Sequence, residues 1–255
     1  MAAVNPRAAR AALAAAGVVL ATAALSGCGA DLDDAEPEKR SFATSAGHVT
    51  IDTDNGDLAV RPADVEEIEV TRWFDGWALI GDPEASWEMD GDRLELRTDC
   101  GPVMGGCAAR YEVLVPRDLR LTVRGDNGDI QARDFGTALT IETDNGDVEV
   151  TGATGPLTLE GDNGDLEATG VTSREVKAVS DNGDVRLVFA SAPQRAGVES
   201  SNGDVTLEVP EGTAYRVDAA TSNGDVSTRL ATDPDGANRL DVRSDNGDIT
   251  LSAAG

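Results

Sequence analysis

The tripeptide Asn-Gly-Asp occurs eight times in this chain of 255 residues. From Asn127 onward, successive copies are 18, 18, 19, 20, 21 and 23 residues apart. A period of about 20 residues is typical of solenoids and repeated hairpins, in which each unit buries its apolar face against the next unit. The motif begins at Asn55, Asn127, Asn145, Asn163, Asn182, Asn202, Asn223 and Asn246.

One unit shows how the repeat is built. Apolar and polar residues alternate from Leu139 to Asp144, then Asn145-Gly146-Asp147 follows, then the short apolar-polar run Val148–Val150. Alternation with a period of two indicates a strand with one buried face. Gly146 supplies a positive φ without a steric penalty. Each unit is therefore predicted to be a strand, a tight turn and a second short strand.

Two all-β architectures fit this unit. In a β-solenoid, successive coils stack about 4.8 Å apart and equivalent residues form ladders. In an antiparallel meander or sandwich, each Asn-Gly is a two-residue hairpin turn. The near-identity of the units favours the solenoid, because laddering makes the same demand on every coil. In that arrangement the apolar side chains of one coil point inward and stack on those of the next coil, with Leu139, Ile141, Val148 and Val150 over Leu157, Leu159, Leu166 and Ala168.

Residues 41–125 are less regular than the repeats of 126–255, although both belong to one predicted domain, 41–255. A first Asn-Gly-Asp unit spans Val49 to Val60, and this part holds most of the aromatic residues. We expect it to be a cap that closes one end of the stack, as repeat proteins require. The alternative is a ligand patch, because aromatic residues are enriched in binding hot spots. Its candidate residues are Trp73, Trp77 and Trp87.

If the last repeat, Leu240 to Leu251, ends the stack without a cap, its sheet edge is open to end-to-end assembly.

The first 27 residues have the pattern of an export signal. Arg7 and Arg10 precede an apolar run from Ala11 to Leu25, which is too short for a comfortable transmembrane helix. The run ends in Leu-Ser-Gly-Cys at Cys28, which resembles the lipobox of bacterial lipoproteins. The resemblance implies cleavage before Cys28, acylation of that cysteine and attachment to the cell membrane, facing outside the cytoplasm. Residues 28–40 are polar and acidic and are predicted to be a tether.

Two further cysteines, Cys100 and Cys107, enclose a flexible hexapeptide. Outside the cytosol a disulfide between them is the expected outcome. A metal site made of these two thiols alone lacks nearby partners, and the spacing is not that of a C-x-x-C redox pair.

The charge and the motif content exclude several classes of function. The chain carries 47 acidic and 21 basic residues, a formal net charge of -26, which argues against nucleic-acid binding. It has one histidine, His48, and no nucleophile elbow, phosphate loop or dinucleotide fingerprint. We therefore expect no enzyme. A polysaccharide-acting β-helix enzyme, using paired carboxylates, is a minor alternative.

The second Asp of the motif is present in all eight units, so a stack places these carboxylates near one another. One interpretation is structural, with each Asp accepting backbone N–H bonds from its own turn. The other is a ladder of cations, because calcium is bound by six to eight oxygens. The candidate calcium ligands are Asp129, Asp147, Asp165 and Asp184.

The repeats as a whole resemble the bacterial "putative-adhesin" family of β-repeat proteins of unknown function. The resemblance rests on the repeated motif and on a Val-Pro strand end, Tyr111 to Pro116, before the first regular repeat. It covers about residues 41–251 and implies a right-handed β-helix-like fold exposed at the cell surface, without an assigned activity.

Together these features predict a lipid-anchored envelope protein whose rigid acidic body binds a cell-wall or extracellular ligand without catalysis. The alternative is a structural or envelope-stress lipoprotein with no dedicated ligand. The two differ in whether the body has a saturable binding site.

Overall fold

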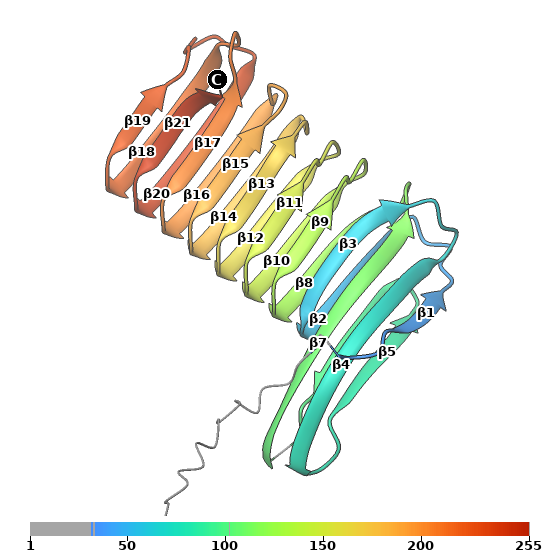
Figure 1. Ribbon diagram of the computed structural model, residues 1–255. Helices are drawn as coiled ribbons and strands as arrows, with labels where there is room; N and C mark the ends of the chain where they lie inside the picture. Colours follow the sequence, from blue (N-terminus) through green and yellow to red (C-terminus); the bar gives the residue numbers. More distant parts are fainter. Residues whose placement is uncertain (1–31, 33, 102, 255) are drawn as a thin grey trace, which may run out of the picture.

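The computed structural model describes residues 32, 34–101 and 103–254, and within them the regular secondary structure is entirely β (Figure 1). Two long sheets lie face to face and enclose one continuous apolar core. No helix in the described part of the chain is long and apolar enough to cross a membrane. The predicted signal peptide and Cys28 lie outside the described residues.

The first sheet, sheet A, has eleven strands. In spatial order they are β1 (Glu38–Phe42), β4 (Ile68–Ile80), β7 (Val103–Pro116), β3 (Asp57–Ala63), β9 (Ile130–Arg133), β11 (Val148–Thr151), β13 (Leu166–Val171), β15 (Val185–Phe189), β17 (Val205–Pro210), β21 (Ile249–Ala254) and β19 (Val226–Arg229).

The second sheet, sheet B, has ten strands. In spatial order they are β18 (Tyr215–Asn223), β20 (Asn238–Asn246), β16 (Arg195–Asn202), β14 (Glu175–Asn182), β12 (Leu157–Asn163), β10 (Leu139–Asn145), β8 (Arg120–Asn127), β2 (His48–Asn55), β6 (Arg93–Asp99) and β5 (Glu84–Asp90).

A coil consists of one strand of sheet B, an Asn-Gly-Asp turn and the following strand of sheet A. Neighbouring coils pair in parallel and in register, with Leu139 beside Leu157 in sheet B and Val148 beside Leu166 in sheet A. Parallel pairing is the solenoid arrangement and excludes the antiparallel meander for the repeats. The handedness stays a prediction.

The apolar ladders expected from the sequence form the core. All eight residues named for this purpose, from Leu139 to Ala168, are fully buried. Burying one such side chain stabilises the fold by about 1.5–3 kcal/mol relative to leaving it exposed. Because each coil buries the same positions against both neighbours, the stack is stabilised along its whole length.

The order of coils in space differs from the order in sequence at both ends. The last repeat in the sequence, β20–β21, lies between β16–β17 and β18–β19. The first, β2–β3, lies between β8–β9 and β6–β7. Leu240 to Leu251 therefore does not end the stack, so the condition for an open edge at this repeat is not met, and the terminal coil is β18–β19.

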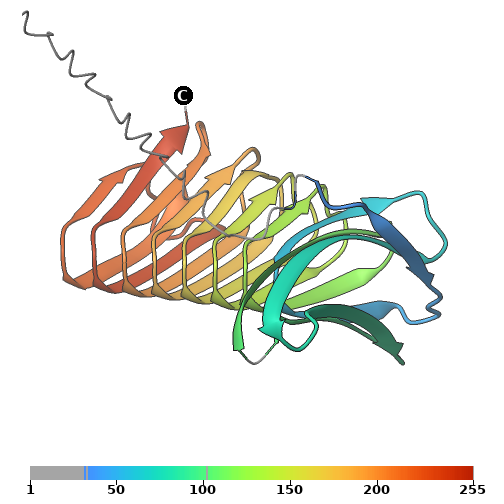
Figure 2. The same ribbon diagram turned by 60° about the horizontal axis from the view of Figure 1, so that its bottom comes forward.

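The N-terminal end departs from the repeat. Strands β4 and β7 pair antiparallel along their lengths, and β1 pairs antiparallel with the outer edge of β4. Figures 1 and 2 show β4 and β7 continuing past the stack as a curved two-stranded extension. We call this extension, residues 74–80 and 103–109, the arm. Strand β1 begins at Glu38, so the last three residues of the predicted tether belong to the sheet.

Candidate binding surfaces

The Asn-Gly-Asp turns form one edge of the stack, and their glycines are required by close packing. Gly164 has φ +132°, and a Cβ built on it would lie 2.2 Å from the carbonyl oxygen of Gly146 in the neighbouring coil. The equivalent glycines from Gly146 to Gly247 show the same approach of 2.1–2.2 Å. Only glycine allows both this dihedral angle and this contact.

The asparagines of the turns form a continuous ladder. In each interior step, Asn Nδ2 donates to the Oδ1 of the Asn in the preceding coil, over 3.0–3.3 Å. The same Nδ2 also donates to the backbone carbonyl just before that Asn. These bonds explain why Asn, which has both a donor and an acceptor, occupies this position in every coil.

The second aspartates form a parallel ladder, with a donor that the sequence did not reveal. The backbone N–H of Asp147 donates to Oδ1 of Asp129, and that of Asp165 donates to Oδ1 of Asp147. Seven such bonds of 2.8–3.1 Å join the coils. The expectation that each Asp carboxylate accepts N–H bonds from its own turn was wrong, because the carboxylate accepts the backbone N–H of the equivalent Asp in the adjacent coil.

This ladder offsets the repulsion between the carboxylates. Two charges 4.8 Å apart in water repel by about 0.9 kcal/mol. A hydrogen bond to a charged acceptor contributes about 1.5–3 kcal/mol. The result is a row of carboxylates, here called the acidic ridge, made of the eight second aspartates and the six leading ones. All are exposed except Asp54, which is half-buried.

The calcium ligands predicted from the sequence, Asp129, Asp147, Asp165 and Asp184, all lie on the acidic ridge. Their Oδ1 atoms accept backbone N–H bonds. In the described part of the chain, no group of three or more His, Cys, Asp or Glu side chains is arranged to hold a metal. Calcium binding stays a prediction.

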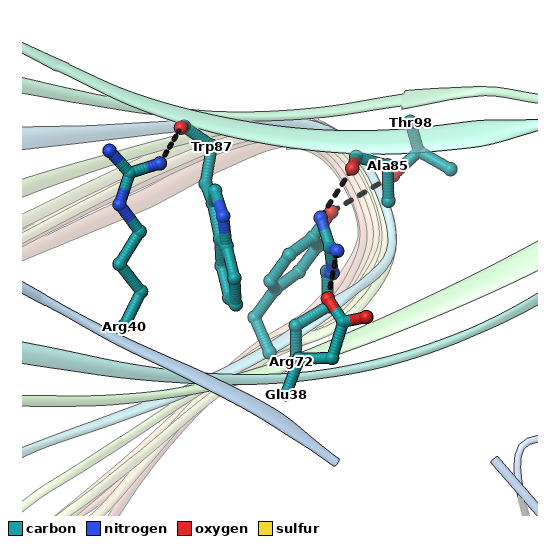
Figure 3. Close-up of polar contacts among 7 residues, drawn as sticks. Glu38, Arg40, Arg72, Ala85, Trp87 and Thr98 are labelled. Carbon is teal, nitrogen blue, oxygen red and sulfur yellow. Dashed lines mark hydrogen bonds and ion pairs between the residues drawn. The ribbon is translucent and has the colours of Figure 1, made fainter. Parts of the chain in front are cut away.

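At the N-terminal end, a cationic side chain closes the gap between the two sheets (Figure 3). Arg72 of β4 donates to the carbonyl of Ala85 and pairs with Glu38. Its guanidinium lies 4.2 Å from the ring centroid of Trp87, and the Arg72 side chain is only 11% exposed. Arg40 of β1 donates to the carbonyl of Trp87 over 3.1 Å. These contacts bind sheet A to sheet B where no further coil covers the core.

The three tryptophans of the predicted ligand patch do not form one surface. Trp87 is partly buried and packs against the core beneath Arg72. Trp73 lies 4.9 Å from the guanidinium of Arg110, from ring centroid to Cζ. Trp77 lies on the arm and is 45% exposed. The cap interpretation therefore describes Trp87, and only Trp77 presents a large exposed aromatic face.

The predicted disulfide is confirmed. Cys100 and Cys107 are bonded, with 5.2 Å between their Cα atoms. Cys107 pairs with Gly76 across the arm, so the bond holds the segment after β6 against the two arm strands.

The sequence did not single out Asp52, a buried acid on β2. Burial raises the pKa of its carboxyl, while Arg93, with which it pairs, acts in the opposite direction. The pKa of Tyr111 is also raised by burial, and its hydroxyl lies 3.1 Å from Thr98 Oγ1. Both residues lie where the first repeat meets the irregular strands, so we interpret them as parts of that junction.

The outer face of sheet A near the N-terminal end is hollowed. A depression of about 340 Å³ is lined by β3, β7 and β9, and another of about 440 Å³ by β1, β3, β4 and β7. Arg61 lines both, and Arg133 and Lys39 line one each.

Comparisons with known proteins agree with this architecture. The model of the Toastrack DUF4097 family matches residues 43–252. A "putative adhesin" from Bacteroides fragilis is 15% identical and has a TM-score of 0.56, covering 86% of this chain and 97% of its own. This likeness shows a shared fold. A "putative cell adhesion protein" from Clostridium sporogenes is 10% identical with a TM-score of 0.36, covering 86% and 100%. No curated protein matches the sequence.

Proposed function

The chain belongs to the Toastrack DUF4097 family, and from this premise we propose that it is a lipid-anchored envelope protein with an adhesin-like binding role. It attaches to the cell membrane through Cys28 and faces outside the cytoplasm. Its rigid acidic body binds a cell-wall or extracellular ligand without catalysis.

The observation that carries this proposal is the continuous stack of hydrogen-bonded coils. The side chains on its outer faces and on the acidic ridge are held at fixed spacing, because each turn is bonded to its neighbour. A pre-ordered surface loses little conformational entropy when it binds an extended ligand. The Bacteroides fragilis protein that shares this fold is named a "putative adhesin", which is consistent with such a role.

Two surfaces are available for the ligand. The acidic ridge suits cationic groups or a divalent cation that bridges to a second anionic molecule. The depressions around Arg61 suit a neutral or anionic ligand, although Glu112 also lines both of them. Among the described residues, Arg61 forms no ion pair. These surfaces respond to different substitutions, so they can be separated by experiment.

The binding test uses the labelled chain from Gly29 onward, co-sedimented with purified cell envelopes in calcium and then in EDTA. We expect saturable binding. Loss of binding in EDTA, and in the double variant Asp147→Asn, Asp165→Asn, assigns it to the acidic ridge. Loss in Arg61→Ala assigns it to the depressions, and Arg186→Ala on the outer face of sheet A is the matched control. No binding under any condition favours the structural or envelope-stress lipoprotein instead.

The anchor has its own test. Fractionation of cells that express the full chain should place it in the membrane fraction, and Cys28→Ser should release it from that fraction. If the Cys28→Ser protein stays with the membrane, another segment holds it there and the lipid anchor is rejected.

A further inference from the structure

The exposed large hydrophobic side chains of the described residues are concentrated at the tip of the arm. Four large hydrophobic side chains are exposed in the described residues, and three of them lie among the last four residues of β4. Trp77 is 45% exposed, Leu79 68% and Ile80 59%. The fourth, Val226, is on the terminal coil at the opposite end of the stack. Such a concentration on a projecting two-stranded extension marks a contact surface.

The arm projects beyond the acidic ridge. In the register of β7 with β3, Arg110 lies beside Asp57, which belongs to the first Asn-Gly-Asp turn. Residues 103–109 therefore extend past the turns. Figure 1 shows this extension below the lower edge of the stack. Seven residues in a strand span up to about 23 Å. At that length the tip can stand more than two Debye lengths from the ridge at physiological salt, where the Debye length is about 8 Å.

The direction of β1 connects the tip to the anchor. Strand β1 runs antiparallel to β4, with Glu38 beside Arg72 and Phe42 beside Ile68. Followed backward from Glu38, the strand direction leads toward the tip. Nine residues separate Cys28 from Glu38, and this length of chain spans up to about 35 Å. The eight residue steps from Arg72 to Ile80 span about 26 Å. A lipid on Cys28 can thus lie level with the tip.

From these observations we propose that Trp77, Leu79 and Ile80 insert into the surface of the bilayer that holds the lipid on Cys28. This inference rests on the proposed lipid anchor. Tryptophan is enriched at membrane interfaces, where its ring is apolar and its N–H stays hydrated. The tether keeps the tip at a high effective concentration near the bilayer, so a small apolar contact is sufficient. The arm then holds the acidic ridge away from the lipid headgroups.

The charge around the tip specifies the lipid. Residues 74–92 contain no Lys or Arg, and they include the exposed acids Asp82 and Glu84. Anionic headgroups would repel these carboxylates, whereas zwitterionic headgroups would not. The contact is therefore directed to zwitterionic lipid, and added anionic lipid should weaken it most strongly at low salt.

The test uses the chain from Cys28 onward, coupled to phosphatidylcholine vesicles. With Cys100 and Cys107 in a disulfide, Cys28 is the remaining cysteine and reacts with a maleimide lipid. We expect the emission of Trp77 to shift to the blue and to be quenched by brominated phosphatidylcholine. This component is read as the difference between the native chain and Trp77→Phe. Its loss in Leu79→Ser, Ile80→Ser would show that the apolar tip drives the contact.

The matched control moves the probe to the other end. Trp77→Phe, Val226→Trp places a tryptophan on the terminal coil, and it should not be quenched. Equal quenching at both positions, or none at Trp77 in coupled chains, overturns the proposal. A concentration-dependent dimer that Leu79→Ser, Ile80→Ser abolishes, without quenching, also overturns it and assigns the tip to a second copy. Because the coupling supplies the anchor chemically, none of these outcomes depends on lipidation of Cys28 in the cell.

Discussion

The regular coils and the N-terminal end build the same two sheets by different means. From β8 onward, the Asn and the second Asp of each turn are bonded to their copies in the next coil, and the buried apolar residues pack on equivalent residues. At the N-terminal end, β1 and β4–β7 use contacts that occur once, such as Arg72 with Trp87 and the Cys100–Cys107 disulfide. Repeated contacts stabilise the interior of a stack but do not cover the core of its last coil. The end must therefore be covered by contacts that occur only there.

The largest expected effect comes from breaking the repeat at a glycine. Gly164→Ala should destabilise the fold by about 4 kcal/mol, because it adds backbone strain and overpacking. Its Cβ would meet the Gly146 carbonyl at 2.2 Å. The matched control is Gly197→Ala in β16, where nothing lies within 4 Å of the added atom. Urea unfolding measures both variants, and equal stability would contradict the close packing of the turns.

The second-largest expected loss of stability comes from removing Arg72 at the N-terminal end of the stack. Arg72→Ala should cost about 3 kcal/mol, because it removes a buried charged hydrogen bond and a stacked cation. The control is Arg124→Ala, which removes an exposed ion pair with Glu142 and should cost less than about 1 kcal/mol. If Arg72→Ala costs no more than the control in chemical denaturation, Arg72 does not close the core.

A smaller difference separates interior from terminal positions of one ladder. Asn163 donates to Asp144 and Asn145 and accepts from Asn182. Asn223, in the terminal coil, only donates within its ladder. Asn163→Ala should therefore cost about 1 kcal/mol more than Asn223→Ala. Equal losses in urea unfolding would mean that the bond Asn163 accepts contributes nothing.

The smallest effect is a pH dependence at the junction of the two regions. Burial raises the pKa of Asp52 above its ordinary value of 3.8, so the folded state binds its proton more tightly than the unfolded state. Stability from this group is present below pH 3.8 and is lost as the pH rises through the raised value. Asp52→Asn should match the native chain at pH 3 and be slightly more stable at pH 7. A less stable variant at pH 7 would show that the ion pair with Arg93 outweighs burial.

The repeat made the coils predictable and left their order open. The alternation around Asn145-Gly146-Asp147 predicted both strands of a coil and the residues facing inward. Every coil, however, offers the same Asn and Asp ladder, so β20–β21 fits between β16–β17 and β18–β19 as well as it would fit beyond them. The sequence alone does not state which neighbour a coil chooses.

The candidate surfaces were predictable only in part. The cysteine spacing predicted the disulfide, and the density of tryptophans located the irregular end. Whether each tryptophan points inward depends on contacts between different strands. Trp87 of β5 lies beneath Arg72 of β4, and the long pairing of β4 with β7 leaves Trp77 on the arm. No local signal shows the pairing of β4 with β7, because its partners are 23 to 45 residues apart in the sequence.

The central claim is that the Asp ladder joins neighbouring coils and does not close individual turns. It is tested by amide hydrogen exchange, resolved by residue, in Asp147→Ala. The structure predicts that the N–H of Asp165, which donates to Asp147, exchanges about tenfold faster or more. The N–H of residue 147, which donates to Asp129, should keep its protection. Faster exchange at residue 147 with an unchanged Asp165 would mean that each Asp serves its own turn, and the inter-coil ladder would be rejected.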